Sequence, residues 1–376
     1  MPLKVMTVVG TRPEVLKLSR VIAELDRRTA HVLVHTGQNY DYELNEVFFD
    51  ELGIRKPDHV LACAAPTAAE AIGNIITRCD RVLAREKPDA LLLLGDTNSC
   101  LAAVIAAKRR KVPVFHMEAG NRCFDERVPE EINRRLVDHA SDIHLPYTEH
   151  ARRYLLAEGV RPETVIKTGS PMREVLAHCA PRIRRSRILR TLGLAPSRYL
   201  VVSAHREENV DDPRRLRGLL DALDAVAKRH GRRIIFSTHP RTRARLAAAR
   251  RPGRHARIEF LKPLGFHDYI RLQTSAWCVL SDSGTLTEES SILGFPAVMI
   301  RQAHERPEGM DEAAVIMADL EPAQVLEAVE LAVAHHAERK SPLRPVADYA
   351  ADNVSKKVVR IILSYTDYVN RTVWRK

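Results

Sequence analysis

Two short acidic segments follow apolar runs in the first third of the chain. Asp96 comes after the run at residues 90–94, within GDTNS, and Glu118 comes after the run at 114–116, within MEAGNR. Each acid thus stands close to a glycine at the predicted carboxyl end of a buried strand. Because ligands of an open parallel sheet bind beyond those strand ends, the two carboxylates are candidates for proton transfer. This pattern indicates an enzyme.

Two other segments have the composition of anion-binding turns. GTRPE at residues 10–14 follows the first apolar run and has Lys17 about one turn later, so a glycine, helix-terminal amides and two cations come together. SDSGT at 281–285 repeats the design in the second half, with Glu288 and Glu289 inside the next predicted helix. A carboxylate there can accept both hydroxyls of a ribose. A turn with solvated charges is the alternative for the first segment.

Histidine and arginine residues follow strands of the second half. AHREEN at 204–209 contains His205, which can titrate near neutrality, and Arg206, which can orient a carboxylate or a diphosphate. THP at 238–240 repeats the design with His239, and a structural role remains open for both histidines. Arg306, in ERPE, is either a surface charge or a phosphate clamp.

The segment PEEINRR at residues 129–135 has a proline followed by two acids, which is typical of a helix N-terminus. Acidic side chains in a first turn interact favourably with the helix dipole. For Glu131 we prefer this interpretation over a role in chemistry.

Short β-branched runs alternate with longer amphipathic stretches, which predicts βαβ units and parallel sheets. Strands are expected at residues 5–9, 31–35, 90–94, 114–116, 143–145, 165–167, 199–203, 233–238, 258–261, 277–281 and 297–300. At 376 residues the chain exceeds the usual size of one core. We expect an α/β fold of two Rossmann-like doubly wound domains, 1–170 and 171–354, with a helix at about 355–376 joining the first and the active site in the cleft between them.

Composition narrows the choice of partners. The net charge of +11 comes mainly from dispersed arginines, and aromatic residues make up only 5%, too few for a base-stacking platform. An anionic small molecule therefore fits better than nucleic acid. No apolar run approaches the roughly 18–20 residues that span a bilayer, and MPLKVMTVVG resembles a first strand rather than a signal peptide, so we expect a cytoplasmic protein without membrane insertion. The six cysteines form no C-x-x-C pair, which predicts neither a metal site nor a disulfide framework.

These segments together resemble the non-hydrolysing UDP-N-acetylglucosamine 2-epimerases. The resemblance covers nearly the whole chain through GTRPEVLK, TGQN, KPDALLLLGDT, HMEAG, PEEINR, AHREEN, THP, SDSG and ERPE, in order. It implies a two-domain glycosyltransferase-B-like fold, a UDP-sugar substrate, no cofactor and a homodimer that supplies precursors of surface polysaccharides. It also implies cleavage of the anomeric C1–O bond and loss of the C2 proton, which leaves a 2-acetamidoglycal beside UDP before re-addition gives the C2 epimer.

The resemblance assigns roles to particular residues. It implies catalytic roles for Asp96, Glu118, Glu130 and His205. It implies substrate contacts for Arg12, Lys17, Arg134, Arg206, His239, Ser283, Gly284, Thr285, Glu289 and Arg306. Among these, Ser283 and Gly284 match the phosphate turn, Glu289 the ribose carboxylate and Arg306 the arginine near the leaving group. Tyr269 falls where an aromatic residue stacks on uracil, with Phe266 as the second choice.

Three segments depart from the common family pattern. The loop NRCFDERV at 121–128 replaces the usual one, Thr285 stands where a second glycine is usual, and residues 63–70 lack the glutamine and arginine of the family's regulatory site. We therefore do not expect activation by UDP-GlcNAc. The loop and the ending SYTDYVNRTVWRK resemble a subgroup that makes UDP-N-acetyl-L-fucosamine from a 6-deoxy-L-talose precursor. A retaining glycosyltransferase, a hydrolysing epimerase and, on charge alone, a nucleic-acid-binding protein are the other hypotheses.

Overall fold

The computed structural model describes residues 2–37, 49–249, 256–338 and 343–376. The chain divides into two compact units: Met1–His178 with Asp348–Lys376, and Cys179–Ala347. The division between His178 and Cys179 falls inside helix α7 (Met172–Arg185), whereas the pattern of strands predicted a boundary at residue 170. The prediction of two doubly wound α/β domains of the glycosyltransferase-B-like type is confirmed.

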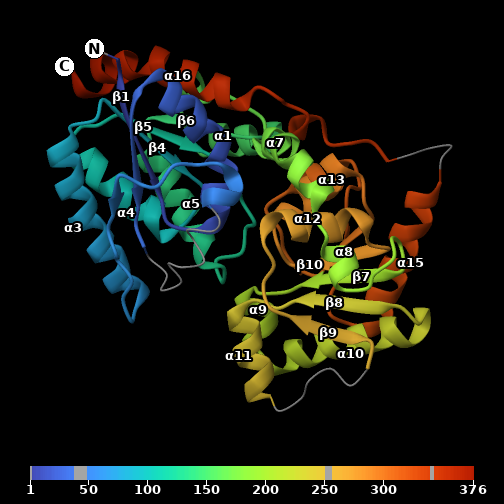
Figure 1. Ribbon diagram of the computed structural model, residues 1–376. Coiled ribbons are helices and arrows are strands. Elements are labelled where there is room, and N and C mark those ends of the chain that lie inside the picture. The colour runs from blue at the N-terminus through green and yellow to red at the C-terminus, as the bar shows by residue number, and fades with distance from the viewer. Residues whose placement is uncertain (1, 38–48, 250–255, 339–342) are drawn as a thin grey trace. The chain divides into compact units, whose positions relative to one another are not determined.

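The first unit contains a six-stranded parallel sheet (Figure 1). Its spatial order is β3-β2-β1-β4-β5-β6. The strands are β1 (Lys4–Val9), β2 (Ala30–His35), β3 (His59–Val60), β4 (Ala90–Leu94), β5 (Val114–Met117) and β6 (Ile143–Leu145). The order reverses between β1 and β4, and such a switch point is where loops separate and leave room for a ligand.

The second unit repeats this topology. Its spatial order, β12-β11-β10-β7-β8-β9, places the reversal between β7 and β10. The strands are β7 (Tyr199–Ser203), β8 (Arg233–Ser237), β9 (Ile258–Leu261), β10 (Cys278–Ser281), β11 (Ala297–Met299) and β12 (Ile316–Met317). The loops after β7 and β10 are those that carry the predicted histidine and phosphate turn.

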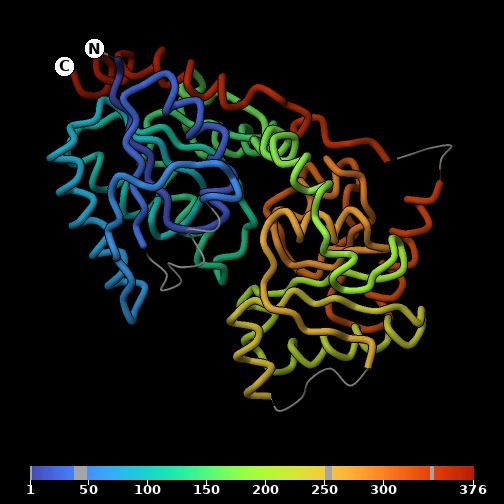
Figure 2. The backbone as a smooth tube through the Cα atoms, viewed as in Figure 1, coloured from blue at the N-terminus to red at the C-terminus, as the bar shows by residue number. Residues whose placement is uncertain are grey.

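Helices of the first unit cover its sheet and join its strands (Figure 1). They are α1 (Arg12–Arg28), α3 (Ala68–Glu86), α4 (Asn98–Arg109), α5 (Pro129–Ala140), α6 (Glu149–Ala157), the first part of α7, α16 (Val354–Val369), and the short helical turns η1 (Pro162–Thr164), η2 (Ala347–Tyr349, at the boundary) and η3 (Asn370–Trp374). Capping fixes where several begin: Thr67 and Glu70 form a capping box at α3. Figure 2 shows the C-terminal segment returning to this unit, where α16 packs against α1.

Helices of the second unit follow the same rules. They are α8 (Ile188–Thr191), α9 (Glu207–Val210), α10 (Pro213–His230), α11 (Pro240–Ala248), α12 (Phe266–Ser275), α13 (Thr285–Leu293), α14 (Pro307–Asp311) and α15 (Pro322–Ala337). Helix α10 begins after the capping residue Asp212, with proline in its first turn, and ends at Gly231 in the left-handed conformation. None of the described helices is long and apolar enough to cross a membrane.

The structure differs from the sequence-based expectations at the edges of the sheets. The strand predicted at residues 165–167 is wrong, because the segment forms only an isolated bridge between His144 and Val165. Thr168 donates its backbone N–H to the Pro146 carbonyl oxygen, but Pro146 has no N–H to return, so the ladder stops. The two-residue edge strands β3 and β12 were not predicted. In the TGQN motif, Gln38 and Asn39 lie outside the described residues.

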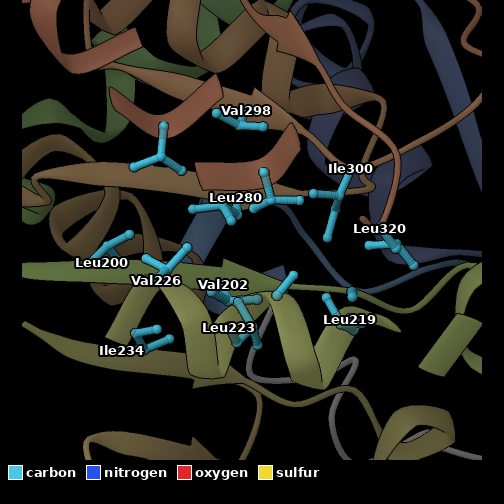
Figure 3. Close-up of a cluster of buried hydrophobic side chains, with 14 of the residues drawn as sticks. Leu200, Val202, Leu219, Leu223, Val226, Ile234, Leu280, Val298, Ile300 and Leu320 are labelled. Atoms are coloured by element: carbon cyan, nitrogen blue, oxygen red, sulfur yellow. The ribbon is translucent and has the colours of Figure 1, made fainter. Parts of the chain in front are cut away.

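Each sheet is buried between hydrophobic layers, which accounts for its continuous apolar strands. Figure 3 shows one layer of the second unit, where side chains of β7, β8, β10 and β11 meet those of α10 and the segment before α15. Leu200, Val202, Leu223 and Leu280 are fully buried there. This packing holds the carboxyl ends of β7 and β10 side by side.

Truncation of the Leu280 side chain tests how much the packing of this hydrophobic layer stabilises the fold. Leu280→Ala should lower the free energy of unfolding by about 2–5 kcal/mol, because the lost side chain leaves a cavity in a close-packed layer. Denaturant unfolding followed by circular dichroism measures the change. Leu331→Ala, on the exposed side of α15, is the matched control and should change stability by no more than about 0.5 kcal/mol. Equal effects of the two substitutions would contradict the assigned packing.

Candidate functional site

Glu118 and Lys17 form a nearly buried ion pair in the first unit. The Lys17 ammonium lies 2.7 and 2.8 Å from the two Glu118 carboxylate oxygens, with side-chain exposures of 7% and 11%. Asn121 donates to the same carboxylate at 3.3 Å. Glu118 has a φ of +62°, a left-handed conformation that is costly for a residue with a side chain. Strained residues of this kind gather at functional sites, so the conformation supports a role for this acid.

Asp96 is held by a second cation–carboxylate arrangement, in which the cation is an arginine. Arg134 of α5 donates to its Oδ2 from Nε at 2.8 Å, and Asn133 donates to its backbone carbonyl at 2.9 Å. The same guanidinium also bonds Glu131 at 2.8 Å. The carboxylate of Asp96 remains partly exposed, at 29%. It is thus oriented by its partners and still accessible.

Glu131 has a different role from the one preferred on sequence grounds. Its fully buried carboxylate accepts backbone hydrogen bonds from Cys123 at 3.0 Å and Phe124 at 3.1 Å. These bonds, with the charge of Arg134, hold the pKa of Glu131 below its usual range although burial alone would raise it. Glu131 therefore fixes the loop 121–128 rather than only interacting with the helix dipole.

Two predicted residues of the first unit make no polar contact with the described part of the chain. Arg12 stands half-exposed at the start of α1, and Glu130 stands half-buried in the first turn of α5. Neither side chain has a hydrogen bond or an ion pair to a described residue. Both are therefore available to a ligand, the arginine to an anion and the acid to a proton.

Glu14 lies beneath the switch point of the first sheet. Its carboxyl accepts hydrogen bonds from the backbone N–H groups of Gly10 and Thr11 at 3.0 and 2.7 Å, and from the hydroxyl of Thr97 at 2.9 Å. Burial raises its pKa, and these hydrogen bonds oppose that effect. Glu14 therefore ties the loop that carries Arg12 to the loop that carries Asp96.

A second buried network lies under the two acids. The His116 ring bonds the Gly95 carbonyl through Nε2 at 2.8 Å and the Asp138 carboxylate through Nδ1 at 2.9 Å. Asp138 also accepts from the backbone N–H of Gly120 at 3.0 Å and from Arg122 at 2.7 Å. The network therefore bonds Gly95, the residue before Asp96, and Gly120, in the turn after Glu118.

Asp282 has the corresponding position in the second unit. Its buried carboxylate accepts from the backbone N–H groups of His205 at 2.9 Å and Arg206 at 3.0 Å, and from Asn209 at 3.2 Å. It also lies 3.1 Å from His205 Nδ1. Burial would raise the pKa of Asp282, but the histidine charge and these bonds hold it below its usual value. Because Nδ1 faces a carboxylate, His205 presents Nε2 to its surroundings, the geometry of an oriented acid–base histidine.

The predicted phosphate turn follows β10 directly. The Ser283 and Thr285 hydroxyls lie 3.0 Å apart at the start of α13. A Cβ atom at Gly284 would lie 2.3 Å from a carboxylate oxygen of Glu305, so a larger residue there would have to displace the Glu305 side chain. Arg206 lies 3.5 Å from the same carboxylate. The turn thus combines helix-terminal amides with a nearby arginine, which is the composition of an anion site.

The remaining predicted residues of the second unit are partly or fully packed. Glu289 is 5% exposed and accepts from Gln273 at 2.8 Å. Tyr269 packs against a second hydrophobic cluster of this unit, which includes Val201 and Val279, and burial, followed by the charge of Glu289, raises the pKa of its hydroxyl. Arg306 is buried and pairs with Glu288 at 3.2 Å. His239 caps α11, and its ring centre lies 5.6 Å from that of His205.

In chemical terms, the first unit offers the carboxylates of Asp96, Glu118 and Glu130 with the cations of Arg12, Lys17 and Arg134. The second unit offers an oriented histidine and a candidate anion-binding turn. The first set suits proton transfer and the second suits a leaving phosphate group. Within the described ranges, no cluster of three or more His, Cys, Asp or Glu side chains is placed to hold a metal ion.

The structure adds residues to which the sequence motifs alone gave no role. Glu14, Asp138, His116 and Asp282 are buried polar groups that hold the loops of the site from below. Glu14 had a local signal, because Thr11 and Glu14 have the spacing of a capping box. His116 and Asp138 are separated by 22 residues in sequence, and no spacing rule predicts their contact.

Sequence comparison places these features in a family. The family model described as UDP-N-acetylglucosamine 2-epimerase matches residues 23–363. The UDP-N-acetylglucosamine 2-epimerase of Methanocaldococcus jannaschii is 32% identical over 374 residues, covering 97% of this chain and 100% of the relative. A Pseudomonas aeruginosa relative named UDP-2,3-diacetamido-2,3-dideoxy-D-glucuronate 2-epimerase is 35% identical over 308 residues, covering 81% of this chain and 84% of the relative.

Solved structures show the same relationship. A UDP-N-acetylglucosamine 2-epimerase structure from Rickettsia bellii is 53% identical, covers 100% of both chains and superposes with a TM-score of 0.92. The M. jannaschii enzyme in complex with UDP-GlcNAc and UDP is 30% identical, covers 96% of this chain and 100% of that chain, and has a TM-score of 0.89. The chain therefore belongs to the UDP-N-acetylglucosamine 2-epimerase family and is an isomerase of nucleotide sugars.

Proposed function

We propose that the protein interconverts UDP-GlcNAc and UDP-ManNAc by eliminating and re-adding UDP. The observation that carries this proposal is the set of three carboxylates Asp96, Glu118 and Glu130 at strand ends and a helix start of one unit. Relatives solved with UDP-GlcNAc and with UDP bound support the choice of substrate. The proposal requires residues of both units to act on one substrate molecule.

The reaction needs no cofactor when charge and protons are managed by side chains. The C1–O bond breaks, and its electron pair leaves with the β-phosphate of UDP. The C2 proton passes to a carboxylate, and the C2–H electrons form the C1–C2 double bond of a 2-acetamidoglycal. Protonation of C2 from the other face and return of UDP to C1 complete the epimerisation. No step of this reaction requires an oxidant or a reductant.

The two units supply different parts of this chemistry. In the second unit, His205, Arg206 and the Ser283–Gly284 turn would receive the departing diphosphate, with Glu289 and Tyr269 proposed for the ribose and uracil. Cations and helix-terminal amides directed at developing charge are an effective form of transition-state stabilisation.

In the first unit, Asp96, Glu118 and Glu130 would carry the protons. The opposite charges of Lys17 and Arg134 hold Glu118 and Asp96 in place, and Arg12 is free to bind an anionic group.

A related substrate is the second candidate. The loop 121–128 departs from the usual family sequence, and Glu131 fixes its conformation with Phe124 64% exposed. The 35% identical relative from P. aeruginosa is named for a different sugar. The same residues would then epimerise UDP-2-acetamido-2,6-dideoxy-L-talose to UDP-N-acetyl-L-fucosamine, with unchanged chemistry at C2.

Incubation with single nucleotide sugars in deuterated water tests the reaction class and the substrate. An epimerase converts its substrate to an equilibrium mixture of two nucleotide sugars that carry deuterium at C2, which proton NMR detects. UDP-GlcNAc and the 6-deoxy-L-talose nucleotide are tested separately. Irreversible release of free sugar would indicate a hydrolase, and no conversion without an acceptor would indicate a transferase. Either result would overturn the proposal.

Glu118→Gln tests the role of the strained acid. The substitution should lower kcat by about 100-fold or more, the usual scale for loss of an acid–base group. UDP affinity, measured by calorimetry, should be retained because the residues proposed for the ribose, the uracil and the departing diphosphate, from His205 to Glu289, lie in the other unit. Glu126→Gln, in the exposed part of the neighbouring loop, is the control and should leave kcat unchanged. Near-normal turnover of Glu118→Gln would remove this residue from the mechanism.

A further inference from the structure

His116 is a buried histidine that the proposed reaction does not use directly. It lies in β5 with 1% of its surface exposed, two residues before Glu118. Both of its ring nitrogens have hydrogen-bond partners: the Gly95 carbonyl oxygen and the Asp138 carboxylate. A backbone carbonyl and an ionised carboxylate can only accept hydrogen bonds. Each ring nitrogen must therefore carry a proton if both bonds are made.

The surroundings of Asp138 support its ionised form. Besides His116, the carboxylate accepts from Gly120 and from Arg122, which also binds Glu158 through Nε at 2.8 Å. Burial alone would raise the pKa of Asp138, but the hydrogen bond and charge of His116, together with Arg122, lower it to about 2. Two cations and two carboxylates then balance in this network, as buried charges require.

His144 provides an internal comparison. It is the register partner of His116 on β6 and is also buried. Its Nε2 bonds the backbone carbonyl of Asp138 at 2.7 Å, whereas its Nδ1 has no hydrogen-bond partner in the described structure. Burial lowers the pKa of His144, which favours the neutral ring. Two histidines in one row thus have environments that favour opposite charge states.

The His116–Asp138 pair also connects the two acid-bearing loops. Through Gly95 it holds the residue that precedes Asp96, and through Gly120 it holds the turn that follows Glu118. A side chain at Gly120 would overlap the Ala151 carbonyl oxygen, so this turn has little freedom to shift. The pair therefore determines how the backbones beneath both carboxylates are placed.

We propose that His116 is held as a buried imidazolium and that, with Asp138, it acts as a positioning residue for Asp96 and Glu118. The positioning role rests on the proposed function, whereas the protonation state of His116 does not. Two N–H donors, each fixed by its own acceptor, orient the ring without freedom to rotate. Loss of one donor would release one of the two loops.

Neutron diffraction of the unaltered, deuterated protein at neutral pD tests the charge state. The expected result is nuclear density for deuterium on both Nδ1 and Nε2 of His116, and on one nitrogen only of His144. A bare nitrogen on His116, or a deuteron on Asp138 Oδ1 in place of Nδ1, would overturn the proposal. This measurement needs neither a variant nor a substrate, so it separates failure of this proposal from failure of the proposed function.

His116→Gln tests the positioning role. The amide group can donate to only one of the two acceptors, so kcat should fall by about 100-fold, the scale expected for misplaced catalytic groups. KM and UDP affinity should change little. His144→Gln is the matched control: it can lower stability, but kcat should stay within about twofold of the unaltered protein. Equal losses of kcat in the two variants, or a fall confined to stability in His116→Gln, would contradict the assignment.

Acid unfolding gives an independent prediction for Asp138. Its folded-state pKa of about 2 lies below the ordinary value of 3.8, so its contribution to stability is present above about pH 4 and is lost as the pH falls towards 2. The free energy of unfolding of the unaltered protein should exceed that of Asp138→Asn at neutral pH, and the difference should shrink over this range. A difference independent of pH would show that Asp138 does not carry the proposed charge.

Discussion

A buried carboxylate at the switch point of each sheet is the constraint on which the site depends. At the ends of parallel strands, backbone N–H groups have no partner in the next strand, and leaving them unpaired in a buried place is costly. Glu14 accepts from two such groups after β1, and Asp282 accepts from two after β7. Each carboxylate also joins a loop of the neighbouring strand. Glu14 accepts a hydrogen bond from Thr97, in the loop after β4, and Asp282 itself lies in the loop after β10. In both units, a buried carboxylate thus accepts hydrogen bonds from the backbone N–H groups that follow the strand at the switch point.

The polar groups packed around Asp96 and Glu118 explain how both acids are fixed in position. Arg134 holds Asp96, Lys17 holds Glu118, and His116 with Asp138 holds the backbone under both. Because opposite charges alternate from one group to the next, the carboxylates are not left as unbalanced buried charge. The left-handed backbone at Glu118 is maintained by this surrounding network.

Much of this architecture could be predicted from the sequence because strand ends are local features. Apolar runs followed by GDT, EAG, AHR and SDSG predicted loops that the structure places directly after strands. The partners of the acids could not be predicted from spacing, since Lys17 and Glu118 are 101 residues apart and His205 and Asp282 are 77 apart. Glu131 was assigned a dipole role because sequence shows its helix position but not the loop folded over it. The strand expected at 165–167 failed because Pro146, a residue of the neighbouring segment, decides whether a ladder can form there.

Pro146 has a further consequence for the edge of the first sheet. Beyond β6 the sheet of the first unit ends in a segment that makes only one bridge. An edge with a full row of free donors and acceptors can template pairing with another molecule and lead to aggregation. The missing N–H of Pro146 interrupts that row. Residues 165–168 cover the edge, where Ile166 and Thr168 donate their backbone N–H groups to the carbonyl oxygens of His144 and Pro146. The same proline that prevents a seventh strand thus protects the sheet against intermolecular growth.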